Sequence, residues 1–212
     1  MSIISKTWLR AWLTHPNLKF TYHDLKIVDT IMERYRDGKI YIEKFELWNT
    51  SGNSSPLVNK WIDVNKWIDI ALQNGVKDLV IIGDYLSLEL VLEACTLMPV
   101  SLSSGVGIMT GNCNSLRKLS LSFVRLDDNT LQTLLSNFPL IVSIHFEYCS
   151  GLNKFDLSNL QKIKSISIMR RYSCPVIIRA PTLEHSSFSC QLSNELDVVE
   201  CQNLKSLDLS CV

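Results

Sequence analysis

A short apolar pattern, L-x-x-L-x-L, returns along the 212-residue chain and restricts its possible folds more than any other feature. The clearest copy is Leu116-x-x-Leu119-x-Leu121. Alternation at its end places two leucines on one face of a short strand. Five copies, one of them degraded by Ser186 in its middle position, end at Leu121, Phe146, Ile168, Phe188 and Leu209.

These copies return at a nearly constant interval. Successive last positions lie 25, 22, 20 and 21 residues apart, within the roughly 20 to 29 residues of leucine-rich repeats. Each repeat of that kind is one strand and one return segment that buries its apolar side only by stacking on its neighbours. The sequence therefore predicts an α/β fold: a leucine-rich-repeat-like solenoid with a parallel strand ladder and with helices and turns on the outer face.

Two earlier strands fit the same pattern with wider spacing. They end at Leu47 and Ile81, and the intervals of 34 and 40 residues leave room for a helix and a longer loop. Apolar residues at helical intervals over 61–72, followed by Gly75, predict one such helix. A second short helix is predicted over 128–135, and either Asp127 or Asp128 can cap its start. In the shorter later intervals we expect irregular turns.

Composition limits the classes of partner. Lys+Arg and Asp+Glu both total 21, so the formal net charge is zero and there is no general attraction to nucleic acid. No apolar run approaches the roughly 20 residues of a membrane-spanning helix, and we expect no membrane contact. The 7 cysteines show no C-x-x-C spacing. They indicate buried thiols in a reducing compartment, the cytoplasm or the nucleus.

Catalytic and ligand-binding motifs are weak in this sequence. The four histidines form no metal-binding pair, and the glycines of 105–111 lack the lysine that a phosphate-binding loop needs. Arg170-Arg171-Tyr172 either contacts an acidic partner or phosphate or, more commonly for such clusters, lies at a hydrated strand edge. We therefore expect no catalytic residue, no metal and no cofactor, and a protein that is not an enzyme.

The outward side of the predicted ladder is the candidate partner-binding face. Residues on either side of each last apolar position point away from the core and line up from strand to strand. This row suits recognition of a protein or small molecule by hydrogen bonds, and equally well a hydrated surface without a ligand. Its members are Ser120, Ser122, His145, Glu147, Ser167, Met169, Ser187, Ser189, Asp208 and Ser210.

A family resemblance rests on several of these segments. Residues 115–121, 131–139, 144–152 with the turn Cys149-Ser-Gly-Leu152, 181–184 and 203–210 resemble the repeat region of plant F-box/leucine-rich-repeat proteins. Upstream, Ile4–Leu13 and 16–20 resemble the last part of an F-box and its exit, although Thr7 stands where the family usually has a basic residue. The resemblance implies a substrate receptor of an SCF-type (Skp–cullin–F-box) ubiquitin ligase, whose repeats capture the protein to be ubiquitinated.

The resemblance also suggests a division of the chain. Residues 1–22 correspond to a remnant of the F-box and its exit, 23–114 to irregular repeats and 115–212 to regular repeats. Trp8, Leu9 and Trp12 are the candidate contacts to a Skp-type adaptor. Because the earlier F-box helices are missing, we expect impaired adaptor docking. An ordinary docked amphipathic helix or, less commonly, an organellar transit peptide are other interpretations of residues 1–23.

Two functions follow from these observations. The first is a protein-binding module, the substrate-recognition part of a ligase receptor, with an unknown protein ligand. The second is a truncated structural pseudo-receptor without a ligase role of its own.

Overall fold

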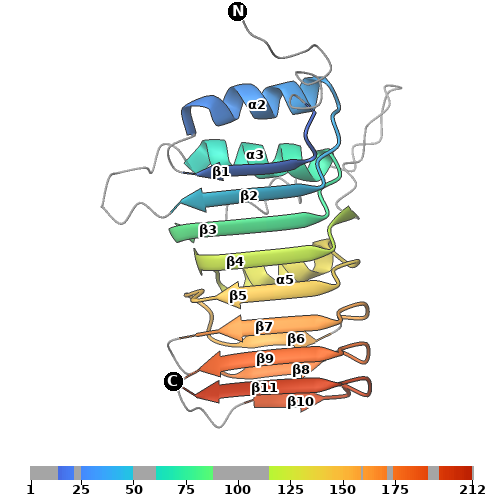
Figure 1. The fold of residues 1–212 in the computed structure, drawn as a ribbon. Helices are drawn as coiled ribbons and strands as arrows, with labels where there is room; N and C mark the ends of the chain where they lie inside the picture. Colours follow the sequence, from blue (N-terminus) through green and yellow to red (C-terminus); the bar gives the residue numbers. More distant parts are fainter. Residues whose placement is uncertain are drawn as a thin grey trace, which may run out of the picture.

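The computed structural model describes residues 14–21, 25–49, 61–87, 115–158, 160–170, 174–190 and 196–211. One long parallel sheet runs through the whole molecule, and a second layer of helices and short strands lies behind it (Figure 1). The predicted solenoid with its parallel ladder is confirmed.

The elements follow one another as strand and return segment along most of the chain. In chain order they are β1 (Asn17–Thr21), α2 (Leu25–Asp37), β2 (Lys44–Asn49), α3 (Trp61–Gln73), β3 (Asp78–Ser87), β4 (Lys118–Arg125), α5 (Asp128–Asn137), β5 (Ser143–Glu147), β6 (Phe155–Ser158), β7 (Ser165–Met169), β8 (Val176–Arg179), β9 (His185–Cys190), β10 (Leu196–Val199) and β11 (Ser206–Cys211).

The long sheet has the order β1-β2-β3-β4-β5-β7-β9-β11, and every neighbouring pair is parallel. All seven predicted last apolar positions are paired in one continuous register, and Phe20 of β1 adds an eighth at the amino-terminal end. We call this line of eight the apolar ladder: Phe20, Leu47, Ile81, Leu121, Phe146, Ile168, Phe188 and Leu209. Strand β1 and helix α2 were not predicted from the sequence.

The second layer consists of helices along the first part of the solenoid and of short strands along the last part. Helices α2, α3 and α5 back the first five strands, whereas β6, β8 and β10 form a three-stranded parallel sheet behind the last three (Figure 1). For the later intervals the sequence predicted irregular turns rather than full helices. The described residues there contain no helix, but they form short strands, so the expectation of irregular turns was wrong. Strand β6 packs onto the long sheet through Phe155, whose ring centroid lies 5.6 Å from that of Phe146.

Helix α2 closes the amino-terminal end of the solenoid. Val28, Met32 and Tyr35 are fully buried at helical spacing, and the Tyr35 hydroxyl donates a 2.7 Å hydrogen bond to the carbonyl oxygen of His15. Helix α3 packs against it, with Trp67 Nε1 donating to Asp29 Oδ1 at 2.7 Å. Helix α2 and its buried side chains therefore cover the core at this end of the described solenoid.

Both long helices end in the same hydrogen-bonded turn. After α3, the Gly75 N–H bonds to the Leu72 carbonyl and the Val76 N–H to the Ala71 carbonyl, a Schellman motif with Gly75 at φ 82° as the sequence predicts. After α2, the left-handed position is instead taken by Lys39, at φ 48°. A left-handed conformation costs free energy in a residue with a Cβ atom.

The two aspartates at the start of the short helix α5 have different hydrogen-bond partners. Asp127 is the N-cap, and its side chain accepts from the Thr130 N–H at 2.6 Å. Asp128 instead accepts from the backbone N–H of Asn153 at 2.9 Å. One carboxylate starts the helix, and the other ties it to the turn of the following repeat.

That turn contains the glycine of the Cys-Ser-Gly-Leu segment. Gly151 has a φ of 87°, and a Cβ atom there would lie 2.5 Å from the Leu126 carbonyl oxygen. The close approach brings the Ser150 carbonyl within 2.8 Å of the Leu126 N–H. Glycine is required at this position for both its φ angle and its lack of a side chain.

Candidate functional site

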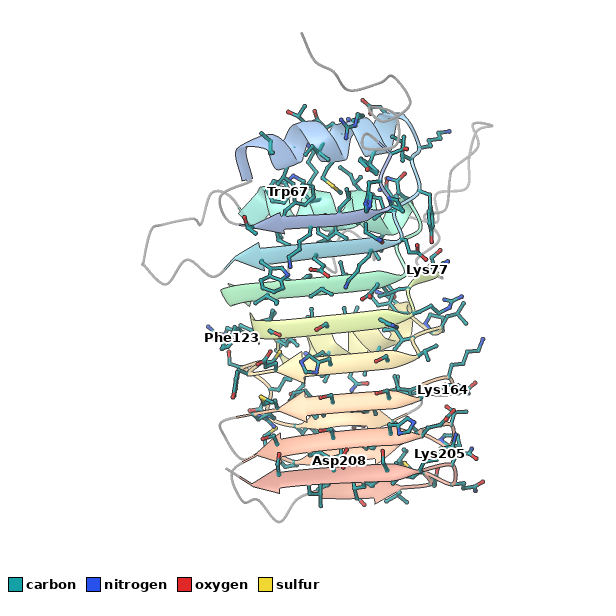
Figure 2. The ribbon with its side chains drawn as sticks, in the orientation of Figure 1. Trp67, Lys77, Phe123, Lys164, Lys205 and Asp208 are labelled. Carbon is teal, nitrogen blue, oxygen red and sulfur yellow. The ribbon has the colours of Figure 1, made fainter. Side chains whose placement is uncertain are left out.

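The outward face of the long sheet carries three rows of side chains that run parallel to the apolar ladder. Side chains alternate between the two faces of a strand, so residues next to a buried ladder position point away from the second layer. We call this surface the outward face. Asp208 marks it on the last strand in Figure 2.

The central row contains half of the predicted partner-binding residues. Ser120, His145, Ser167 and Ser187 are paired across consecutive strands, and Asp208 continues the row on β11. Toward the amino terminus the same row continues through Val80, Glu46 and Lys19. The structure therefore brings these five predicted residues together in one line.

The second row contains the other predicted residues in the same register. It consists of Ser122, Glu147, Met169, Ser189 and Ser210, preceded by Thr21, Trp48 and Ile82. Ser122 differs from the rest because it is buried, and its hydroxyl donates to Glu147 Oε2 at 3.0 Å. Its role is to hold the Glu147 carboxylate, which also lies 3.9 Å from His145 Nε2.

A third row at the strand starts was missed by the sequence analysis. Its members are Asn17, Lys44, Asp78, Lys118, Ser143, Ser165, His185 and Ser206. The signal was present in the seven predicted strands, since each of these residues immediately precedes the middle position of its motif, although that position is Ser186 on β9. On the last strands, His185 Nδ1 lies 2.9 Å from the Ser206 hydroxyl.

The outward face is charged over its first strands. Glu46 lies 3.6 Å from Lys19 Nζ and also pairs with Lys44, which in turn lies 3.9 Å from Asp78. Burial raises the pKa of the Glu46 carboxyl, but the hydrogen bond and charge of Lys44 outweigh it and the pKa is lowered. Trp48 completes this group with Lys19 Nζ 3.9 Å from its ring centroid.

Over the later strands the same face is mostly hydroxyl-bearing and uncharged. Serines occupy most of the positions of β7, β9 and β11 in the three rows, with His185, Met169 and Asp208 among them. Hydroxyl groups both donate and accept hydrogen bonds. A partner lying across these strands would meet adaptable polar groups here and fixed ion pairs near β1 and β2.

Two aromatic rings lie where strands β4 and β5 end. The centroids of Phe123 and Tyr148 are 5.3 Å apart, and both residues have a left-handed backbone, at φ 57° and 50°. This conformation is unusual for bulky residues. It interrupts the alternation, so that Val124 and Cys149 are buried in the core. Figure 2 shows Phe123 at the strand-end edge of the sheet.

Several predicted residues lie outside the described part or are used within the fold. Trp8, Leu9, Trp12, the glycines of 105–111, Arg171 and Tyr172 lie outside the described residues. Arg170 packs its guanidinium 4.6 Å from the Phe155 ring centroid and donates to the Cys174 carbonyl. Arg170 therefore serves the packing of the second layer.

The thiols that the structure describes are mostly core residues. Cys149 and Cys174 are buried, and Cys149 Sγ lies 3.4 Å from the Leu121 carbonyl oxygen. Burial raises the pKa of the Cys149 thiol to about 11, which keeps it protonated and unreactive near neutral pH. Among the described residues, no group of three or more His, Cys, Asp or Glu side chains could hold a metal ion.

With the ladder and its outward face established, comparisons place the chain among known proteins. A family model described as "At1g61320/AtMIF1, LRR domain" matches residues 39–212, which is most of the chain. The chain belongs to this leucine-rich-repeat domain family. Strand β1 and helix α2, which close the first end of the solenoid, precede the matched region.

Curated relatives of this leucine-rich-repeat domain come from Arabidopsis thaliana. Putative F-box/LRR-repeat protein At3g18150 is 23% identical over 219 residues, covering 99% of this chain and 46% of the relative. Putative F-box protein At1g49610 is 28% identical, covering 79% and 43%, and F-box/LRR-repeat protein 25 is 25% identical, covering 82% and 67%. The chain thus spans just under half the length of the first two. No solved structure matches it.

The resemblance to plant F-box/leucine-rich-repeat proteins is confirmed by these matches. In the described part of the chain, no helix is both long enough and apolar enough to cross a membrane.

Proposed function

We propose that this chain is a protein-binding module that captures a partner on the outward face of its long sheet, as the substrate-recognition part of an SCF-type ubiquitin-ligase receptor. The observation that carries the proposal is the in-register alignment of outward side chains, most of them polar, over eight strands. A face of this kind offers many hydrogen-bonding groups on a rigid support, which lowers the entropy cost of binding.

The later strands are the preferred contact region of this proposal. Ion pairs already satisfy Lys44, Glu46 and Asp78 near the amino terminus, and a partner must break or bridge such pairs to use them. The serines of β7 and β9 that lie on the outward face (Ser165, Ser167, Ser187 and Ser189) are partly exposed and carry small side chains, so a partner can approach the sheet closely there. His145 and Glu147 border this region and supply directional hydrogen bonds.

The experiment compares a face variant with a charge-matched control. The face variant, Ser167→Arg with Ser187→Arg, places two bulky cations in the centre of the proposed contact. The control, Gln161→Arg with Gln202→Arg, adds the same charge at exposed turn residues. The three proteins are immobilised, incubated with a plant extract, and their captured proteins are quantified by mass spectrometry.

We expect a defined set of proteins to be captured by the wild type and the control and to be lost with the face variant. Capture that is identical for all three proteins contradicts binding through the outward face. The ligase role is tested separately with a purified Skp-type adaptor in a biosensor assay, where we expect weak or no binding of this chain. Tight adaptor binding contradicts the expected impairment of docking.

The alternative, a structural pseudo-receptor without a ligase role, requires that no captured protein depends on the outward face. Weak or no adaptor binding is expected in both cases, so the capture experiment is the measurement that separates the two alternatives.

A further inference from the structure

The residues that directly precede the strands of the long sheet form a fourth line, beside the third row. The Lys77 carbonyl oxygen accepts from the backbone N–H groups of both Arg117 and Lys118, at 2.8 and 2.9 Å. The same pair of bonds joins every two neighbouring strands of the long sheet, so one residue at each strand start is held in line. The line consists of Pro16, Glu43, Lys77, Arg117, Val142, Lys164, Glu184 and Lys205.

Cations outnumber carboxylates in this line. It contains Lys77, Arg117, Lys164 and Lys205 but only two acids, and Lys118 follows Arg117 at the start of β4. We call these five cations the basic edge, and Figure 2 shows its three labelled lysines along one side of the sheet. Because the whole chain has a formal net charge of zero, positive charge is concentrated at this edge rather than spread evenly.

The two acids of the line compensate the basic edge only in part. Glu43 lies 3.8 Å from Lys77, and both side chains are about half exposed. Glu184 is shared between Lys164 and Lys205. Ion pairs between exposed groups contribute little free energy, so a partner's carboxylate can replace Glu43 beside Lys77.

Lys118 carries the clearest excess charge of the basic edge. Its side chain is exposed, and within the described part of the chain it pairs with no carboxylate. Its neighbour on β3, Asp78, lies 3.9 Å from Lys44 instead. A carboxylate from outside the chain can therefore pair with Lys118 without displacing another group.

The basic edge lies along the side of the solenoid. Lys77, Arg117, Lys118 and Lys164 begin or directly precede β3, β4 and β7, and each of these strands is paired on both sides. The position of these four cations is therefore independent of what adjoins β1 or β11. Ser165, which follows Lys164, belongs to the third row, so the basic edge borders the serine-rich part of the outward face.

We propose that the partner captured on the outward face presents an acidic peptide segment, rich in aspartate or glutamate, to the basic edge. This inference rests on the proposed function, because it specifies the chemistry of the partner that the outward face captures. Ammonium and guanidinium groups form strong, charge-assisted hydrogen bonds with carboxylates. The acidic segment would cross the strand starts while the rest of the partner covers the serines.

The spacing of the cations restricts the sequence of this segment. Neighbouring strands lie about 4.8 Å apart, and Val142 occupies the strand start between Arg117 and Lys164. The backbones of these two cations are therefore about 10 Å apart, a distance that an extended peptide spans with about three residues. We expect two neighbouring acidic residues for the cations of β3 and β4, and a further one about three residues away for Lys164.

The acids within the line favour a peptide over a nucleic acid. Glu184 lies between Lys164 and Lys205, and their hydrogen bonds lower its pKa to about 2, so its carboxylate is charged at neutral pH. A nucleic acid carries a negative charge on every phosphate of its backbone and would place phosphates against this carboxylate. A peptide can place an uncharged residue there.

The experiment measures the binding of two fluorescent peptides to the full chain by fluorescence anisotropy. The first peptide has two adjacent glutamates and another three residues further on, and the second has glutamine at the same places. The edge variant is Lys77→Gln with Lys118→Gln. The matched control, Arg125→Gln with Lys154→Gln, removes the same charge away from the basic edge. Arg125 is exposed at the other end of β4, and Lys154, like Lys77, belongs to one surface ion pair.

We expect the wild type and the control to bind the glutamate peptide at least about 10-fold more tightly than the glutamine peptide, and the edge variant to lose this preference. Circular dichroism and thermal unfolding check that each variant is folded. Equal affinity of the wild type for the two peptides overturns the inference. An equal loss in the edge variant and the control also overturns it, as does a single-stranded DNA oligonucleotide that binds the basic edge more tightly than the glutamate peptide.

Capture from the plant extract distinguishes a failure of this inference from a failure of the proposed function. Proteins that are lost with the face variant but retained by the edge variant contradict the role of the basic edge alone. Capture that the face variant does not change contradicts the proposed function, and with it the inference, whatever the peptides show.

Discussion

The two halves of this solenoid carry the same ladder but are backed by different structure. Where the described return path spans 25 residues or more, as between Leu47 and Ile81 or between Leu121 and Phe146, it contains a helix. Where it spans 20 to 22 residues, after Phe146, it contains a four-residue strand. A helix advances about 1.5 Å per residue and a strand about 3.3 Å, so a helix needs roughly twice as many residues for the same distance.

The same division runs through the outward face and the two ends. Ion pairs and Trp48 cover the first strands, and serines cover the last ones. The helix-backed end is closed over Phe20, while the strand-backed end leaves Leu209 exposed. The helix-backed strands therefore present ion-paired side chains, whereas the strand-backed ones present mostly hydroxyl groups.

The largest difference in the free energy of unfolding is expected between alanine substitutions at two equivalent ladder positions that differ in burial. Phe146 is fully buried and contacts Phe155 of the second sheet, so Phe146→Ala should lower the free energy of unfolding by about 3–5 kcal/mol. Leu209→Ala, at the same ladder position but exposed, should cost less than about 1 kcal/mol. Urea unfolding of the two variants and the wild type measures both losses. Equal losses would show that the last strand is packed like the others.

The second largest difference in stability is expected between alanine substitutions at the turn glycines of the two halves. Gly151→Ala forces a Cβ atom to within 2.5 Å of a carbonyl oxygen and should cost about 2–3 kcal/mol. At Gly75 the nearest atoms to an added Cβ, in the Tyr41 ring, lie 3.5 Å away, so Gly75→Ala meets only backbone strain and should cost about 1 kcal/mol. Thermal unfolding of the two variants tests this order, and a reversed order contradicts the close approach at Gly151.

A gain in stability is expected at the end of α2. Lys39 holds the left-handed position that Gly75 holds after α3. Lys39→Gly should stabilise the chain by a few tenths to about 1 kcal/mol, because glycine adopts this conformation without steric cost. Lys39→Ala serves as the control that removes the side chain but keeps the Cβ atom. If both variants were stabilised equally, the strain at Lys39 would not be the cause.

The smallest effect concerns acid titration at the strand-start edge, where Lys77, Lys164 and Lys205 are labelled in Figure 2. Hydrogen bonds from Lys205 and Lys164 lower the pKa of Glu184 from 4.5 to about 2. Because the folded pKa lies below the unfolded one, this contribution to stability is present above pH 4.5 and is lost as the pH falls toward 2. NMR titration should find the low pKa and should find it raised in Lys205→Met. An unchanged pKa in that variant would remove Lys205 as the cause.

Much of the fold could be predicted because the ladder is a local pattern. Each L-x-x-L-x-L motif specifies its own strand and its buried face, and equal spacing makes neighbouring strands pair in register. The central and second rows followed from the same alternation. The helix over 61–72 and the alternative caps at Asp127 and Asp128 were also visible as periodicity and capping residues.

Other features of the fold are only weakly indicated by the sequence. The four-residue strands β6, β8 and β10 are too short to show a clear alternation, and they are stable because they pair with one another. The burial of Ser122 could not be predicted either, since it depends on Glu147 in the next strand. For β1, the apolar residues Leu18 and Phe20 were assigned to a different segment, and only pairing with β2 identifies them as part of the sheet.

The sequence by itself thus determined which side chains face the core, because strand alternation and repeat spacing are encoded in consecutive residues. Only the tertiary structure decided what lies behind each strand, which end is covered and which polar groups satisfy one another. Those outcomes depend on contacts between residues far apart in the chain, whose partners are chosen by the space that the other repeats leave.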